Sequence, residues 1–144
     1  MALIAFFEDR RTPDGHLDIG EHEAKTLARE AAAVDALAGE LGVAPLTSFE
    51  SYTLGDLRET LDEREWQELL ATTEPASFPV RQWFAPAEGL RSVRALLTGL
   101  RARPDVWMGD ARTRERAERE LETLASDLER AQERGTRFFL RAVL

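Results

Sequence analysis

The sequence of 144 residues contains no cysteine, two histidines and only one lysine. The absence of cysteine excludes thiol catalysis, zinc–thiolate centres and the disulfide framework of a small secreted domain. No stretch of about twenty apolar residues is present, so we expect no membrane span. The apolar start, Met1 to Phe7, is too short for a signal peptide and lacks a basic flank. These absences predict a soluble protein of the cytoplasm.

Sequence motifs of catalysis are also missing. The chain has no Gly-x-Ser-x-Gly motif and no glycine-rich loop that would cradle a phosphate. The densest group of potential metal ligands is Asp18, Glu21, His22 and Glu23, and only Asp18 and His22 are spaced to share a helix face. Because a helix dipole favours acidic residues near the helix start, we interpret this group as a helix start. We therefore predict no catalytic residue, metal or cofactor, and favour a non-enzymatic role.

Charge is unevenly distributed along the chain. The basic residues are 18 arginines and Lys25, a bias typical of a GC-rich bacterial genome. The net charge is −8, of which residues 1–75 carry −11 and residues 76–144 carry +3. This negative excess argues against nucleic acid as a partner, since phosphate binding depends on Lys and Arg. Two arrangements stay open: the halves neutralise each other in the fold, or they form an acidic face and a basic face.

Both ends of the chain have the composition of β-strands. Ala2 to Phe7 is apolar on both faces, and residues 136–144 are short, aromatic and partly β-branched after Gly135. Two strands need each other, and no third segment of similar quality lies between them. We predict an α+β fold, mostly helical, in which the terminal strands form an antiparallel pair covered by helices.

Apolar residues at helical spacing predict four or five helices over residues 21–41, 54–61, 62–70, 86–103 and 110–134. Gly42 follows the first helix at the left-handed C′ position. Asp62 and Glu65 form a capping box that starts a new helix or a kink. Pro86 is placed as a first helical residue, and Pro104 ends that helix. Since no linker divides the chain, we expect one compact domain over residues 1–144.

The segment from residue 81 to 94 combines aromatic and basic side chains at a junction between loop and helix. Its residues of interest are Arg81, Trp83, Phe84, Arg91 and Arg94. Arginine grips carboxylates bidentately, and Trp and Arg dominate interface hot spots. The alternative to a binding site is that the aromatic side chains fill the core and the arginines are exposed to solvent.

An acidic run in the second helical region is the complementary candidate, represented by Glu59, Asp62 and Glu63. Such a surface accelerates the encounter with a basic protein, although a solvated helix face has the same composition. We predict a protein-binding module that captures a basic protein, with an immunity or inhibitor role as one form. The alternative is a domain, enzymatic or not, that binds a small anionic ligand in an arginine-lined pocket near residues 81–94. A third alternative is a structural subunit, which a stable homo-oligomer with no other partner would indicate.

Overall fold

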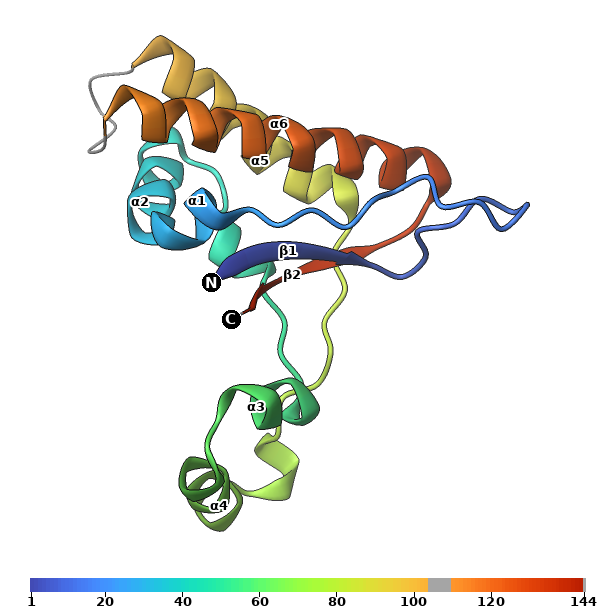
Figure 1. Cartoon of the computed structure of the whole chain (residues 1–144), viewed down its shortest axis with the longest axis vertical. Helices are drawn as coiled ribbons and strands as arrows, with labels where there is room; N and C mark the ends of the chain where they lie inside the picture. The colour runs from blue at the N-terminus through green and yellow to red at the C-terminus, as the bar shows by residue number, and fades with distance from the viewer. Residues whose placement is uncertain (104–109, 144) are drawn as a thin grey trace.

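The computed structural model describes residues 1–103 and 110–143 (Figure 1). In chain order its strands and helices are β1 (Ala2–Phe7), α1 (Lys25–Arg29), α2 (Ala31–Leu41), η1 (Leu46–Phe49), α3 (Leu54–Thr60), α4 (Glu63–Thr72), η2 (Pro75–Ser77), α5 (Pro86–Ala102), α6 (Ala111–Arg134) and β2 (Phe138–Val143). Here η denotes a short 3-10 helix. No helix of the described residues is both long enough and apolar enough to cross a membrane.

The two terminal strands pair with each other, as predicted. β1 and β2 are antiparallel, with a register that runs from Ala2 opposite Val143 to Phe7 opposite Phe138. Helices α5 and α6 lie side by side over one face of this pair, and α1 and α2 lie at one end of it (Figure 1). The α+β architecture is therefore confirmed, with six α-helices in the described residues where four or five were predicted.

The core forms between the sheet and the two long helices. Side chains alternate between the faces of a strand, so Phe138 and Leu140 point to the helices and are 1% exposed. Gly89 allows α5 to lie directly on β2, because a Cβ at this position would be 2.5 Å from Phe138 Cζ. The apolar residues that recur every three or four positions along α6 are all buried, namely Ala117, Leu121, Leu124, Leu128 and Ala131.

The first helix differs from the prediction. The spacing of apolar residues placed its start at Glu21, but α1 begins at Lys25 and a break at Glu30 separates it from α2. Residue 24 is extended because Ala24 exchanges two backbone hydrogen bonds with Leu3, at 3.0 and 2.9 Å. Since residues 20–24 precede the helix, the group around His22 is not a helix start, and that interpretation is wrong.

Other helix boundaries are where the sequence places them. Gly42 ends α2 with a φ of 71°, and Asp62 and Glu65 form both hydrogen bonds of the predicted capping box at the start of α4. Pro86 is the first residue of α5, and α6 ends at Gly135. Pro104, which was predicted to end a helix, and Leu144, the last residue of the predicted C-terminal strand, lie outside the described residues.

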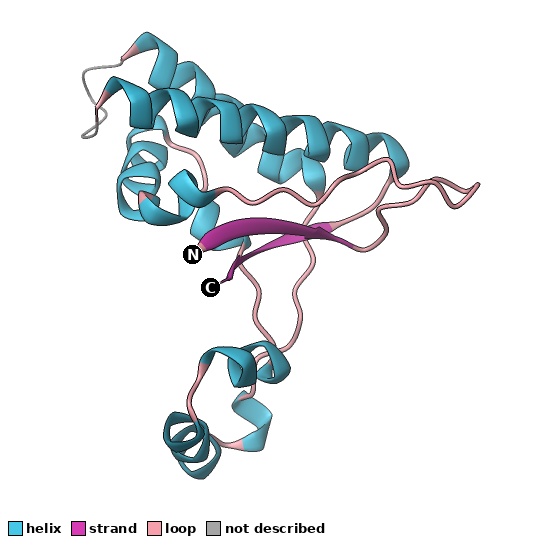
Figure 2. Cartoon of the chain, viewed as in Figure 1, coloured by secondary structure: helices cyan, strands magenta, loops and turns pink. Residues whose placement is uncertain are grey.

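Helices α3 and α4 lie apart from the other helices. They are on the side of the sheet opposite α5 and α6, and loop segments join them to the rest of the chain (Figure 2). We call residues 54–77, from α3 to η2, the arm, and the described residues 1–49, 84–103 and 110–143 the body. The two segments that join them, residues 50–53 and 78–83, are the connecting segments.

Candidate functional site

The arm exposes most of its surface. None of the residues of α3, α4 and η2 is buried. Five of its apolar residues are instead half-buried, namely Leu54, Leu57, Leu61, Trp66 and Leu69. Two capping boxes fix the helix starts, one formed by Thr53 with Asp56 and the other by Asp62 with Glu65. Local hydrogen bonds therefore define the helix starts of the arm.

The surface of the arm is acidic. Residues 54–77 contain seven acidic and two basic side chains, a net charge of −5. Arg58 binds Glu63 at 2.7 Å and lies 5.0 Å from the centre of the Trp66 ring. Arg64 binds Glu68 at 3.3 Å within α4. From outside the arm, Arg81 and Arg141 bind Asp56, and Arg141 also lies 3.6 Å from Glu59. Seven carboxylates therefore face four arginines, and the arm keeps an excess of three negative charges.

The three acidic residues predicted to contact a partner lie together at the turn between α3 and α4. Glu59 is in the last turn of α3, Asp62 is the N-cap of α4 and Glu63 is its first residue. The side chains of Glu59 and Glu63 are 70% and 68% exposed. The Glu65 N–H holds the pKa of Asp62 below its usual value, and Gln67 and Arg58 do the same for the pKa of Glu63. Both groups are therefore ionised at neutral pH.

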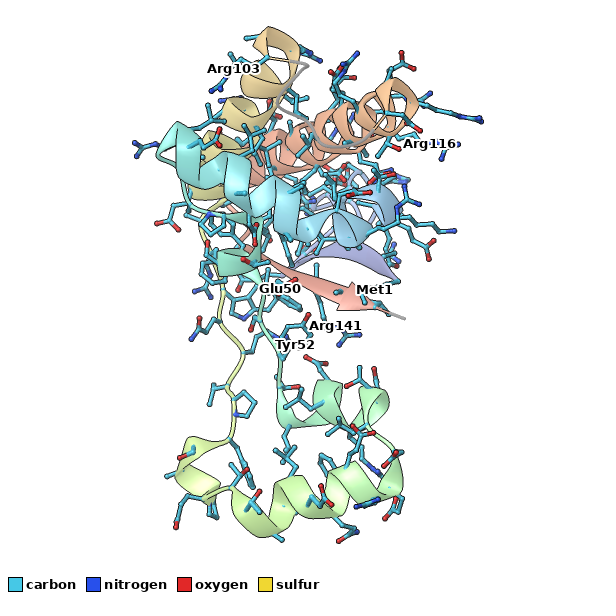
Figure 3. The ribbon with its side chains drawn as sticks, turned by 90° about the vertical axis from the view of Figure 1, so that its left-hand side faces the viewer. Met1, Glu50, Tyr52, Arg103, Arg116 and Arg141 are labelled. Atoms are coloured by element: carbon cyan, nitrogen blue, oxygen red, sulfur yellow. The ribbon has the colours of Figure 1, made fainter. Side chains whose placement is uncertain are left out.

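A half-buried ionic network fastens the arm to the outer face of the sheet. Asp56 of α3 accepts a hydrogen bond from Arg81 at 2.6 Å and another from Arg141 of β2. Burial by itself would raise the pKa of Asp56, but the Thr53 N–H and the two guanidinium groups hold it below the usual value. Tyr52 adds a hydrogen bond from the Ala142 N–H to its hydroxyl at 3.1 Å. Figure 3 shows Tyr52 and Arg141 between the body and the arm.

The aromatic residues of the 81–94 segment pack against the sheet. The Arg81 guanidinium lies 3.8 Å from the centre of the Phe139 ring, and Trp83 meets the same ring edge-on at 5.2 Å. Phe84 exchanges two backbone hydrogen bonds with Phe138, at 2.8 and 3.0 Å. Arg81 and Trp83 therefore anchor the connecting segment on the sheet, and Phe84 forms an isolated β-bridge with Phe138.

Arg91 and Arg94 belong to a different layer of the molecule. Both are exposed on α5, which covers the inner face of the sheet, and Arg94 binds Glu129 of α6 at 2.9 Å. Arg81 is on the outer face and is already bound to Asp56. The structure thus does not bring these three arginines together, and an arginine-lined pocket near residues 81–94 remains a prediction from the sequence.

A cleft that the sequence did not indicate opens at the outer edge of β1. It has a volume of about 710 Å³ and lies between β1, residues 21–24 and α6. His22 Nδ1 lies 2.8 Å from a carboxylate oxygen of the buried Asp127, although 105 residues separate the two in the chain. Asp18 instead binds Arg134 at 2.5 Å. Within the described residues no three potential ligand side chains are grouped to hold a metal ion.

Comparison with known proteins identifies no relative. No family model, curated protein or solved structure matches the chain. Function must therefore be argued from the two features above, the acidic arm and the cleft beside β1. The arm offers charge on an exposed projection, which suits recognition of a macromolecule. The cleft offers a concave surface that is open to solvent on one side, which suits a small molecule.

Proposed function

We propose that the chain is a non-enzymatic protein-binding module that captures a basic protein through the acidic surface of its arm. An immunity-like or inhibitor-like role is one form of this function. The observation that carries the proposal is the net charge of −5 on a projection that has no buried residue. A core-forming helix pair would hide one face, whereas α3 and α4 leave side chains such as Leu70, 39% exposed, at the surface.

The arm also carries contacts that fit a protein partner better than a simple ion. Glu59, Asp62 and Glu63 form a compact acidic group, and the half-buried Trp66 lies in the same arm. Acidic side chains steer a basic partner to the surface, and an adjacent aromatic side chain supplies apolar contact area. The network at Asp56 holds this surface in one orientation relative to the body, which lowers the entropy lost on binding.

Affinity purification of three tagged proteins from the organism's own cells tests the proposal. The arm variant combines Glu59→Lys, Asp62→Asn and Glu63→Lys, where Asn retains an N-cap for α4. The matched control combines Glu115→Lys, Glu133→Lys and Glu40→Gln, which make the same change of charge at exposed positions of the body. We expect the wild type and the control to recover one basic protein at low salt, with less at high salt.

The recovered protein is then expressed and titrated by calorimetry against all three forms. The arm variant should bind at least about tenfold more weakly than the control, because most of the attraction is electrostatic. Circular dichroism of the three forms verifies that the variants fold. Equal affinity of the arm variant and the wild type would contradict the proposal.

A further inference from the structure

The cleft beside β1 has a defined frame. At one end Ala24 pairs with Leu3 through both backbone hydrogen bonds. At the other end the Arg10 guanidinium bridges the strand and residue 20, since it donates to the carbonyl oxygens of Ala5 and Gly20. Between these points the bond from His22 to Asp127 draws the chain towards α6. The edge of β1 and residues 21–24 therefore separate, and the cleft lies between two closed ends.

The floor of the cleft is apolar. Leu3 and Ala5 of β1, Leu124 of α6 and Leu140 of β2 line it, and each belongs to the core of the body. Small-molecule sites commonly enclose roughly 300–1,000 Å³ over a largely apolar surface with a few polar groups. The volume of about 710 Å³ falls within this range.

The rim of the cleft is acidic. The cleft is lined by Glu21, Glu23, Glu120 and Asp127 and by one arginine, Arg119, while Arg10 closes one end and Lys25 Nζ lies 3.9 Å from Glu23. Glu120 is occupied as a helix cap, since its carboxylate accepts the N–H groups of Thr26 and Leu27 at 3.2 and 2.9 Å.

Asp127 is also occupied, because it accepts from His22. Glu21 and Glu23 lie on the extended segment and are exposed. Glu21 also acts on Arg10: burial lowers the pKa of that arginine, while the charges of Glu21 and Asp127 oppose the shift.

We infer that this cleft binds a small aliphatic amine, with its carbon chain on the apolar floor and its ammonium group between Glu21 and Glu23. The negative charge of the rim favours a cation, and the apolar floor favours a cation that carries a hydrocarbon chain. A metal ion is disfavoured because the described residues provide no group of three potential metal ligands.

An extended peptide added along β1 is disfavoured as well. Leu3 already pairs with Ala24, and the carbonyl of Ala5 already accepts from Arg10. This site is independent of the arm and of the function proposed for it.

Hexylammonium is the probe, with ethylammonium and hexanoate as comparisons, and binding is followed by amide chemical shifts in ¹⁵N-labelled protein. We expect shifts confined to residues 3–5, 21–24 and 119–127. Each added methylene should raise the affinity about fourfold until the floor is covered. Hexanoate, which has the same chain length and the opposite charge, should bind at least about tenfold more weakly than hexylammonium.

Two variants separate the rim from the floor. Glu21→Gln combined with Glu23→Gln should weaken hexylammonium binding about tenfold, while Thr123→Phe, which fills the cleft from α6, should abolish it. Glu59→Gln with Glu63→Gln on the arm removes the same charge and should leave binding unchanged. The inference is overturned if hexanoate binds as well as hexylammonium, if the shifts lie elsewhere, or if about 10 mM hexylammonium produces none.

Discussion

The body and the arm are stabilised in different ways. The body buries a continuous set of apolar side chains between the sheet and α5 and α6, and Leu121 and Leu128 are fully inaccessible. The arm buries no residue and depends on capping boxes, exposed ion pairs and the network at Asp56. Apolar burial stabilises by roughly 25 cal/mol per Å², whereas an exposed ion pair contributes at most about 1 kcal/mol. The free energy of unfolding therefore depends mainly on the body, whereas hydrogen bonds and ion pairs hold the arm in place.

Truncating one leucine in each region should produce the largest difference between them. Leu128→Ala removes a side chain that is 0% exposed and should cost about 3–4 kcal/mol of the free energy of unfolding. Leu69→Ala removes a half-buried side chain of the arm and should cost about 1 kcal/mol. Urea denaturation followed by circular dichroism measures both. Similar losses for the two variants would show that the arm is part of the cooperative core.

Removing the charge of Asp56 should separate the arm from the body without unfolding the body. Asp56→Asn removes the carboxylate that Arg81 and Arg141 share, and Arg141 keeps only the exposed Glu59, at 3.6 Å; the two arginine side chains are 23% and 17% exposed. We expect a cost of about 2 kcal/mol, confined to the docking of the arm. Hydrogen exchange should accelerate in the connecting segments, and amides of α5 and α6 should exchange as before. Glu68→Gln, which removes an ion pair within the arm, is the control and should leave this pattern unchanged.

Lowering the pH should release the arm from the body, as the Asp56→Asn substitution does. The pKa of Asp56 lies below its ordinary value of about 3.9 because of the Thr53 N–H, Arg81 and Arg141. A carboxylate with a lowered pKa stabilises the fold above the ordinary value, and this contribution disappears as the pH falls through the lower, folded value. Exchange in the connecting segments should therefore rise below about pH 4 in the wild type. The Asp56→Asn variant should lack this transition.

Local signals in the sequence account for what could be predicted of the fold. The terminal strands, the capping box at Asp62 and the end of α6 at Gly135 depend on neighbouring residues, and each was predicted. The start of the first helix was not, because the apolar spacing of residues 24–41 is helical while Ala24 is held extended by Leu3. A partner distant in sequence overrides the local pattern there.

The same distinction applies to the candidate sites. Glu59, Asp62 and Glu63 could be grouped from the sequence because they are neighbours in the chain. Their projection on an arm could not, since Leu54, Leu57 and Leu61 recur at spacings of three and four, as they would in a helix packed on a core. The cleft depends on the contact between His22 and Asp127 and on the edge of β1, and residues this far apart leave no signal in a single sequence.

The smallest effect we predict lies at the boundary of the two regions, at Glu50. Burial and the nearby charge of Asp35 raise the pKa of Glu50 above its ordinary value. The two residues line one small cavity of about 120 Å³, and Asp35 Oδ1 is buried with no hydrogen-bond partner in the described part of the chain. An ionised Glu50 therefore opposes folding at neutral pH. Protonation of Glu50 should remove this destabilisation as the pH falls from the raised pKa of Glu50 in the folded protein towards the ordinary pKa of about 4.3.

Glu50→Gln should remove that repulsion and stabilise the protein by about 1 kcal/mol at pH 7, since the amide also offers a donor to Asp35. The pH dependence has the opposite sign to that of Asp56: mild acid should stabilise the wild type through Glu50, while stronger acid should destabilise the arm through Asp56. Thermal unfolding of wild type and Glu50→Gln between about pH 4 and pH 7 measures the difference, which should shrink as the pH falls. The exposed Glu40→Gln is the control for loss of one charge. A Glu50→Gln variant less stable than the wild type at pH 7 would show that the carboxylate of Glu50 has a stabilising partner, and the body would then be held at this boundary by charge, as the arm is.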